Sequence, residues 1–177
     1  LLSDIPPDAG QIRLRAQASS RDDEGLVLTD VDPTSWRSAI SWVPQSPTLV
    51  PGTILDNMGD LPQRDLDEAA RATGFDAVLA TTPDGWNSTI GSGGVGLSVG
   101  QRQRLALTRA LAARSQVVVL DEPTAHLDAV SEETVVRAIH AMREEGRTVI
   151  VIAHRNAIIE VADTIIDVAH ADEEALA

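Results

Sequence analysis

The chain has 177 residues, 43% of them hydrophobic, and a formal net charge of -13. This length suits one domain with a buried core, and no apolar run approaches the roughly 20 residues of a membrane-spanning helix. The acidic balance argues against broad electrostatic binding of nucleic acid or anionic lipid, and the absence of cysteine excludes disulfides and thiolate metal sites.

The first 80 residues predict short elements separated by polar and turn residues. Residues 11–14 indicate a strand, and the polar stretch 16–25 indicates a surface insertion. Residues 39–43 indicate a second strand, which leads to Gln45. Three short helices separated by Gly and Pro are then expected, at residues 53–57, 65–72 and 75–80.

A glycine-rich turn and a helix follow. Residues 91–96, GSGGVG, fit the dinucleotide-binding pattern G-x-G-x-x-G, but no convincing buried strand precedes them and no partner acid follows in a βαβ unit. The next residues, LSVGQ, lead into an expected helix at 102–113 that is rich in Leu, Ala and Arg. Ser98 and Gly100 lie at the helix entry, where backbone N–H groups are left free for an anion. The helix dipole also favours phosphate there.

The third quarter of the chain predicts a buried strand that ends in acids. Residues 117–120, VVVL, are typical of a strand covered on both faces of a parallel sheet. Asp121 and Glu122 follow at its carboxyl end, where open α/β sheets bind ligands. There one carboxylate can hold a magnesium ion and the other can orient or deprotonate an attacking water.

The remaining elements continue the sheet. Residues 131–143 show apolar side chains at helical spacing, and residues 148–152 predict another buried strand that ends near His154. Residues 164–168 predict a strand that closes the sheet, and the acidic tail 171–177 is expected to fray.

Four motifs in one order resemble the ATP-binding cassette (ABC) ATPases. WVPQ, LSVGQ, VVVLDEPTAHLD and VIVIAHR are similar to the Q-loop, the signature, the joined Walker B and D-loop, and the H-loop of that family. The resemblance implies an α/β fold: a P-loop NTPase-like core with a mostly parallel sheet and an inserted α-helical signature subdomain. It divides the chain into core strands up to the Q-loop (1–45), the helical subdomain (46–115), the rest of the core (116–170) and a tail (171–177).

The resemblance also implies what each motif does. Glu122 and His154 are expected to be catalytic, and Asp121 with Gln45 is expected to hold Mg²⁺. The residues expected to contact ATP are Gln45, Ser98, Gly100, Gln101 and Asp128. In this family two such domains pair head to tail, so that the signature of one faces the nucleotide held by the other.

One family motif is missing. The phosphate loop G-x-x-x-x-G-K-[ST] uses a lysine to reach the β and γ phosphates, and all 14 basic residues of this chain are arginines. The chain is therefore expected to be truncated at its N-terminus, just after its own phosphate loop, and the 177 residues alone are expected to be inactive as an ATPase.

The subtype follows from smaller motif variants. SPTLVPGTILDNM resembles exporters, and Val99 in LSVGQ with His126 in AHLD looks similar to the CydD/CydC class. The resemblance to that class implies export of cysteine and glutathione for cytochrome bd assembly. It also implies a heterodimer with a transmembrane domain fused upstream, located at the cytoplasmic face of the bacterial inner membrane.

Two alternatives remain open, and a third lacks support in the sequence. The chain is compatible with an exporter half for a lipid, peptide or drug, and with a non-catalytic interaction module, because it lacks the lysine. A soluble ABC ATPase of DNA repair would need long coiled-coil heptads interrupting the domain, and the sequence contains none.

Overall fold

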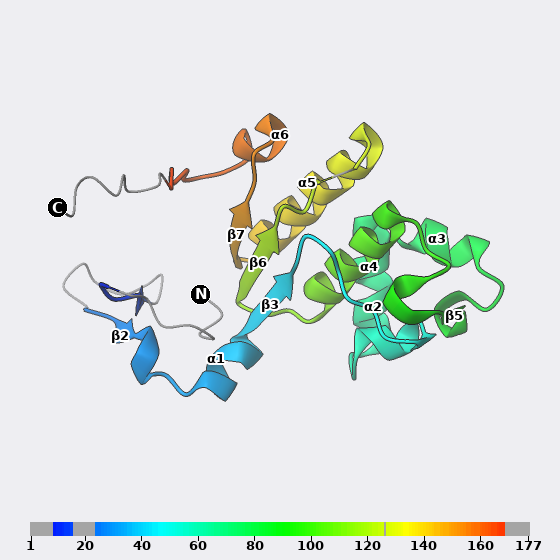
Figure 1. Cartoon of the computed structure of the whole chain (residues 1–177), viewed down its shortest axis with the longest axis horizontal. Coiled ribbons are helices and arrows are strands. Elements are labelled where there is room, and N and C mark those ends of the chain that lie inside the picture. The colour runs from blue at the N-terminus through cyan, green and yellow to red at the C-terminus, as the bar shows by residue number, and fades with distance from the viewer. Residues whose placement is uncertain (1–8, 16–23, 126, 169–177) are drawn as a thin grey trace.

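A three-stranded parallel sheet lies at the centre of the chain. The computed structural model describes residues 9–15, 24–125 and 127–168, and Figure 1 shows their arrangement. The strand order is β3 (Ile40–Val43), β6 (Val117–Asp121) and β7 (Thr148–Ile152), with both neighbouring pairs parallel. The predicted α/β fold with a parallel sheet is confirmed.

The register of this sheet aligns the carboxyl ends of its strands. Val43 of β3 pairs with Leu120 of β6, and Asp121 of β6 pairs with Ile152 of β7. Because the three strands run in one direction, the residues that follow them emerge at the same edge. This edge carries the polar residues expected from the Q-loop, Walker B and H-loop motifs.

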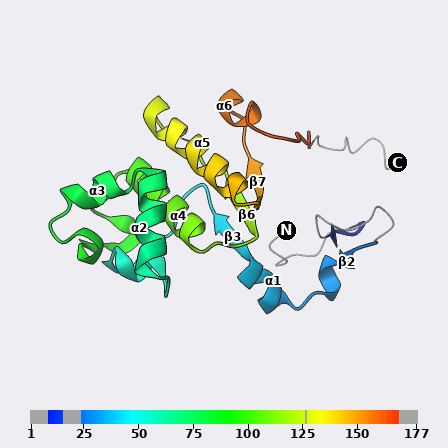
Figure 2. The ribbon, with the colours of Figure 1, turned by 180° about the vertical axis from the view of Figure 1, so that it is seen from behind.

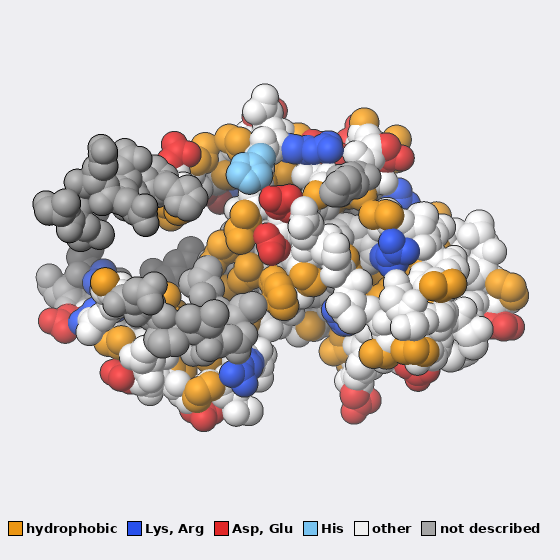
Figure 3. All heavy atoms as spheres, viewed as in Figure 1, with side chains coloured by type: hydrophobic (Ala, Val, Ile, Leu, Met, Phe, Trp, Pro, Cys, Tyr) orange, Lys and Arg blue, Asp and Glu red, His pale blue; other side chains and the backbone are white. Residues whose placement is uncertain are grey.

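Helices cover one face of the sheet. Val118 and Leu120 have no exposed surface and belong to the same apolar core as residues of α4 (Val99–Ala112) and α5 (Ala129–Glu144). The opposite face is open among the described residues, and Trp42 and Ile152 are about half exposed there. Figure 3 shows hydrophobic side chains gathered over β3 and β6 on this side.

A helical part lies beside the sheet, as both ribbon views show (Figures 1 and 2). It contains α2 (Gln63–Thr73) and α3 (Asp76–Thr81), and α2 packs along α4. Its core includes fully buried Met58, Leu66 and Phe75. A small antiparallel pair, β4 (Gly52–Thr53) with β5 (Thr89–Ile90), joins the segment after β3 to the segment before α4.

Several boundaries differ from the predictions. The helix expected at 53–57 is a short 3-10 helix, and the helix expected from 102 begins at Val99. Two helices were not predicted, α1 (Pro33–Ala39) and α6 (Asn156–Ile159). The 3-10 helices are Leu28–Asp30, Leu55–Met58, Gly85–Asn87 and Ser92–Gly94.

Two strand predictions need correction. The strand expected at 11–14 shortens to β1 (Arg13–Leu14), which pairs antiparallel with β2 (Leu26–Val27) and not with the central sheet. Residues 164–168 form no strand, although their pattern is apolar, and Ile166 is 81% exposed. A strand needs a neighbour for its backbone hydrogen bonds, and the described residues offer this segment none.

Two further predictions concern residues outside the described ranges. The insertion expected at 16–25 falls mostly on residues 16–23, and the tail 171–177 also lies outside them. Within the described residues, no helix combines the length and the apolar composition needed to cross a membrane.

Candidate functional site

The carboxyl edge of the sheet brings together the polar residues that follow its three strands. Gln45 follows β3, Asp121 and Glu122 lie at the end of β6, and His154 follows β7. We call these four residues the sheet-edge cluster. In Figure 3 a histidine and acidic side chains lie together at this end of the sheet.

Glu122 is the centre of the sheet-edge cluster. The carboxamide Nε2 of Gln45 donates a hydrogen bond of 2.8 Å to its Oε2, and His154 Nε2 lies 3.7 Å from its Oε1. The Glu122 side chain is 35% exposed and that of His154 is 83% exposed. A carboxylate that is partly shielded, oriented by an amide and still open to water has the geometry of a group that can accept a proton or align a water molecule.

The backbone at Glu122 is in an unusual conformation. Its φ is 44°, in the left-handed region that residues other than glycine rarely adopt. Two backbone hydrogen bonds hold it there: its N–H donates to Ile152 O at 2.9 Å, and its C=O accepts from Ala125 N at 2.9 Å. Such a conformation costs about 1–3 kcal/mol and is most common at functional sites. No pattern in the sequence indicated this turn.

The donor set at the edge fits magnesium bound together with a nucleotide. The described residues contain no cluster of three or more His, Cys, Asp or Glu side chains suited to a metal ion. Magnesium usually takes one or two carboxylates together with substrate phosphates rather than a cage made of protein alone. The half-buried carboxylate of Asp121 and the carboxamide oxygen of Gln45 are oxygen donors of that kind.

A second group of expected site residues lies at the amino end of α4. Ser98 is the N-cap: its Oγ accepts from Gln101 N at 3.2 Å, and Gln101 Oε1 accepts from Ser98 N at 2.8 Å. This reciprocal capping box satisfies two of the amides that a helix start leaves free. Among the described hydrogen bonds, none engages the amides of Val99 and Gly100. The side chains of Ser98 and Gln101 thus also have a structural role that the motif alone did not reveal.

Asp128 lies across a hollow from this turn. It is the N-cap of α5 and accepts from Ser131 N at 2.8 Å. Hydrogen bonds from the Ser131 backbone and side chain, and the nearby positive charge of Arg104, hold the pKa of Asp128 below its usual range. The hollow has a volume of about 280 Å³, and its lining is Val78, Ser98, Gly100, Gln101, Arg104, Leu127, Asp128 and Ser131.

Four of these lining residues were not predicted as site residues, and two of the four, Arg104 and Ser131, are polar. Arg104 donates to Ser131 Oγ at 3.2 Å and so joins α4 to the start of α5. Helical spacing could have indicated Arg104, because it lies three and four positions after Gln101 and Gly100 and so shares their face of α4. Ser131 could have been found as the third residue after Asp128 if that aspartate had been recognised as a helix N-cap.

The structure therefore places the expected residues in two groups. Gln45, Asp121, Glu122 and His154 meet at the sheet edge, whereas Ser98, Gly100, Gln101 and Asp128 surround the hollow between α4 and α5. Within the described residues, no hydrogen bond or ion pair connects the two groups. His126 lies outside the described residues.

Known proteins resemble this chain over most of its length. A family model described as "ABC transporter" matches residues 1–125. The ABC-type transporter atr1 of Mycosarcoma maydis is 36% identical over 169 residues, and the ABC multidrug transporter MDR5 of Trichophyton rubrum is 40% identical over 147 residues. These alignments cover 90% and 80% of this chain.

A solved structure shares the fold. A bacterial Atm1-family ABC exporter with ATP bound has a TM-score of 0.70 and 32% sequence identity, over 78% of this chain and 25% of the exporter chain. The two fungal relatives are much longer than this chain, which spans 12% of one and 11% of the other.

Proposed function

This chain belongs to the ABC transporter family, and on that premise we propose that it is the ATP-binding and ATP-hydrolysing part of an exporter. The observation that carries the proposal is the sheet-edge cluster, where Gln45 and His154 converge on the carboxylate of Glu122. This arrangement suits hydrolysis because attack on a phosphate needs a positioned water and little covalent chemistry from the protein.

Each residue of the sheet-edge cluster has a part in the proposed reaction. Glu122 orients or deprotonates the attacking water, and Gln45 holds the carboxylate and senses the water and the metal. The exposed imidazole of His154 contacts the γ-phosphate. Asp121, with Gln45, would hold Mg²⁺, which neutralises charge on the phosphates when it is bound.

The second group serves a nucleotide held by a partner domain. Ser98 and Gly100 at the start of α4 offer a hydroxyl, backbone amides and the positive end of the helix dipole, all of which favour phosphate oxygens. Asp128 lies beside them and links the two sites, and Gln101 fixes the turn through the capping box. The separation of the two groups in one chain supports a head-to-tail dimer, in which each domain completes the site of the other.

The lysine that contacts the β and γ phosphates must come from polypeptide outside these residues, since this sequence has no lysine. We therefore propose that the 177 residues work only as part of a longer protein that also carries a transmembrane domain. In that protein the chain would lie at the cytoplasmic face of a membrane, and closure on ATP would drive the membrane part.

A drug-like compound is the proposed cargo class. The relatives whose names state a cargo class are multidrug transporters, which supports this choice over thiols. A second candidate, export of cysteine and glutathione for cytochrome bd assembly in a bacterial inner membrane, rests only on the motif variants Val99 and His126. Vesicles that contain the full-length transporter separate the two: ATPase stimulation by amphipathic drugs and not by glutathione supports the first, and the opposite result supports the second.

The activity itself is tested by comparing two proteins. We would measure ATP binding and ATPase rate for the 177-residue chain and for a version extended upstream by about forty residues, roughly a strand, a loop and a short helix. Binding and turnover by the extended form alone is the expected result. Binding by neither form would contradict the proposal and would favour a non-catalytic interaction module.

A further inference from the structure

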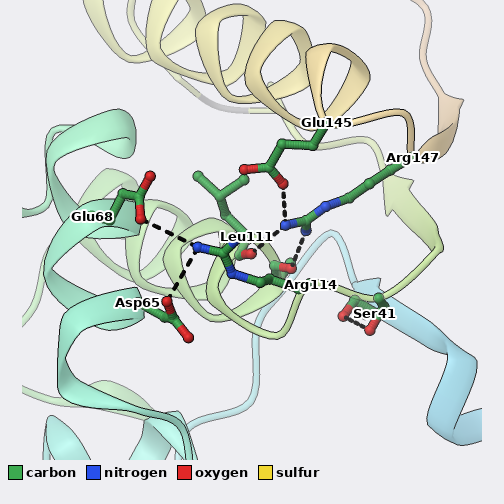
Figure 4. A network of polar contacts seen from close by, with 9 residues as sticks. Ser41, Asp65, Glu68, Leu111, Arg114, Glu145 and Arg147 are labelled. Carbon is green, nitrogen blue, oxygen red and sulfur yellow. Dashed lines mark hydrogen bonds and ion pairs between the residues drawn. The ribbon is translucent and has the colours of Figure 1, made fainter.

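A buried arginine joins the end of α4 to the start of β7. Arg147 immediately precedes β7, and its side chain is only 3% exposed. Its guanidinium donates to the backbone carbonyls of Ala110 at 3.2 Å and Leu111 at 2.8 Å, in the last turn of α4, and it forms an ion pair with Glu145 (Figure 4). The free carbonyls and negative dipole at a helix end make this a favourable position for a cation.

The backbone around Arg147 is equally well fixed. Its N–H donates to Met142 O at 3.1 Å where α5 ends, and Gly146 adopts the positive φ of 75° that this helix ending requires. The next amide, that of Thr148, donates to Gln116 O at 2.9 Å, immediately before β6. The ends of α4 and α5 and the starts of β6 and β7 therefore meet around Arg147 and Thr148.

The far ends of these elements carry the two groups of site residues. α4 has 14 residues and begins at the Ser98 cap, whereas β7 ends at Ile152, whose carbonyl accepts from Glu122 N, and leads to His154. At about 1.5 Å per residue, α4 extends about 20 Å from Arg147 to the Ser98 turn. A tilt of about 5° at the Arg147 end would move that turn by nearly 2 Å at its other end.

From this geometry we propose that Arg147 is a positioning residue: it holds the carboxyl end of α4 against the sheet and so sets where the Ser98 turn lies relative to Glu122 and His154. The planar fork of its guanidinium suits this role because two carbonyls and one carboxylate are bound at the same time. The chain offers an internal comparison in Arg114. That side chain is half exposed and pairs with Asp65 and Glu68 of α2, so it ties the end of α4 to α2 and not to the sheet (Figure 4).

The test uses the full-length protein with spin labels at two exposed positions, Ala77 on α3 and Glu133 on α5. This chain contains no cysteine, so each label site is unique within it. We would compare Arg147→Lys, which keeps the charge but loses the fork, with Arg114→Met. Distance distributions are measured without nucleotide, and kcat and KM for ATP are measured on the unlabelled proteins.

Arg147→Lys is expected to broaden the distance distribution and to lower kcat by about tenfold or more, with KM for ATP within about twofold, because a displacement of about 1 Å can cost up to about a hundredfold in rate. Arg114→Met is expected to leave the width of the distance distribution and kcat within about twofold of the unaltered protein. An unchanged distribution in Arg147→Lys, or equal broadening in Arg114→Met, would overturn the proposal.

A second variant tests whether the effects of Arg147→Lys come only from a folding defect. Removing only one partner of a buried ion pair leaves an uncompensated charge, so the double variant Arg147→Met with Glu145→Gln removes both charges together. A folded double variant with a broadened distribution supports positioning, and loss of folding in both variants would assign Arg147 to stability and overturn the proposal. The kcat comparison rests on the proposed ATPase function, whereas the distance measurement does not, so an inactive parent protein would count only against the former.

Discussion

Gln45 donates a hydrogen bond of 2.8 Å to the carboxylate of Glu122, across 77 positions of sequence. The parallel register makes this contact possible, because Val43 pairs with Leu120 and the chain continues two residues beyond each. The two side chains are carried by different segments, one leading from β3 into the helical part and the other turning back after β6. Any movement of the segment after β3 therefore acts directly on the orientation of Glu122.

The first prediction concerns Glu122 itself. In the full-length transporter, Glu122→Gln should retain ATP binding, because the amide keeps the shape and can still meet Gln45, but it should lose most turnover. Loss of a positioned base typically costs about a hundredfold to ten-thousandfold in rate. ATP binding and steady-state hydrolysis are measured in parallel, with the exposed Glu133→Gln as the matched control. Normal turnover in Glu122→Gln would remove this residue from the mechanism.

The second prediction separates folding from dimerisation at Ser98. Ser98→Ala and Ser98→Arg both lose the N-cap, and each should destabilise α4 by about 1 kcal/mol. Only the arginine adds bulk and charge where the partner's phosphate is expected, so Ser98→Arg should also impair ATP-driven dimerisation. Thermal unfolding and ATP-dependent dimer formation are measured for both variants. Similar dimerisation by the two would argue against contact between Ser98 and the partner's nucleotide.

The sequence predicted much of the sheet edge and less of its surroundings. Apolar blocks at β3, β6 and β7 indicated buried strands, and parallel pairing then required Gln45, Glu122 and His154 to share an edge. The left-handed backbone at Glu122 could not be predicted, because it depends on a hydrogen bond to Ile152, which is distant in sequence, and on one from Ala125 in an irregular turn. The strand expected at 164–168 was wrong, since an apolar pattern specifies a tendency but not the neighbour that a strand needs.

The third prediction compares two glycines near the start of α4. A Cβ added at Gly100 would meet Ser131 Oγ at 3.4 Å and Leu127 Cδ2 at 3.8 Å, so Gly100→Ala should fold normally or gain stability. At Gly94, which is buried with a φ of 78°, a Cβ would approach Arg102 Cδ at 2.7 Å and Leu49 Cδ1 at 2.8 Å. Gly94→Ala should therefore lose about 1–3 kcal/mol of stability. Chemical denaturation measures both.

Gly100→Ala also tests whether the start of α4 contacts a nucleotide held by a partner domain. Close approach of a phosphate to the backbone at the start of α4 is easiest without a Cβ, so this variant should weaken ATP-driven dimerisation although its unfolding midpoint stays the same or rises. Dimer formation is measured at saturating ATP by light scattering. Full dimerisation by Gly100→Ala would show that no ligand comes close to this position.

The last prediction concerns acid sensitivity at Asp128. Hydrogen bonds from the Ser131 backbone and side chain lower the pKa of this carboxyl from its ordinary value of 3.8. A group whose pKa is lower in the folded protein stabilises it above the unfolded pKa, and this contribution disappears as the pH falls through the folded pKa. Unfolding free energy should thus decline as the pH falls below about 4, with Asp32 and Asp56 adding to the effect because hydrogen bonds also lower their pKa values.

Asp128→Asn isolates the contribution of Asp128 to this loss of stability at acid pH. Asparagine caps a helix about as well as aspartate, so the variant should match the parent near neutral pH and lose less stability on acidification. Asp128→Ala removes the cap as well and should be less stable than the parent at neutral pH. Unfolding curves between about pH 7 and pH 3 distinguish the three proteins. An acid profile of Asp128→Asn that coincides with the parent would mean that the Ser131 contacts do not hold the ionised carboxyl in solution.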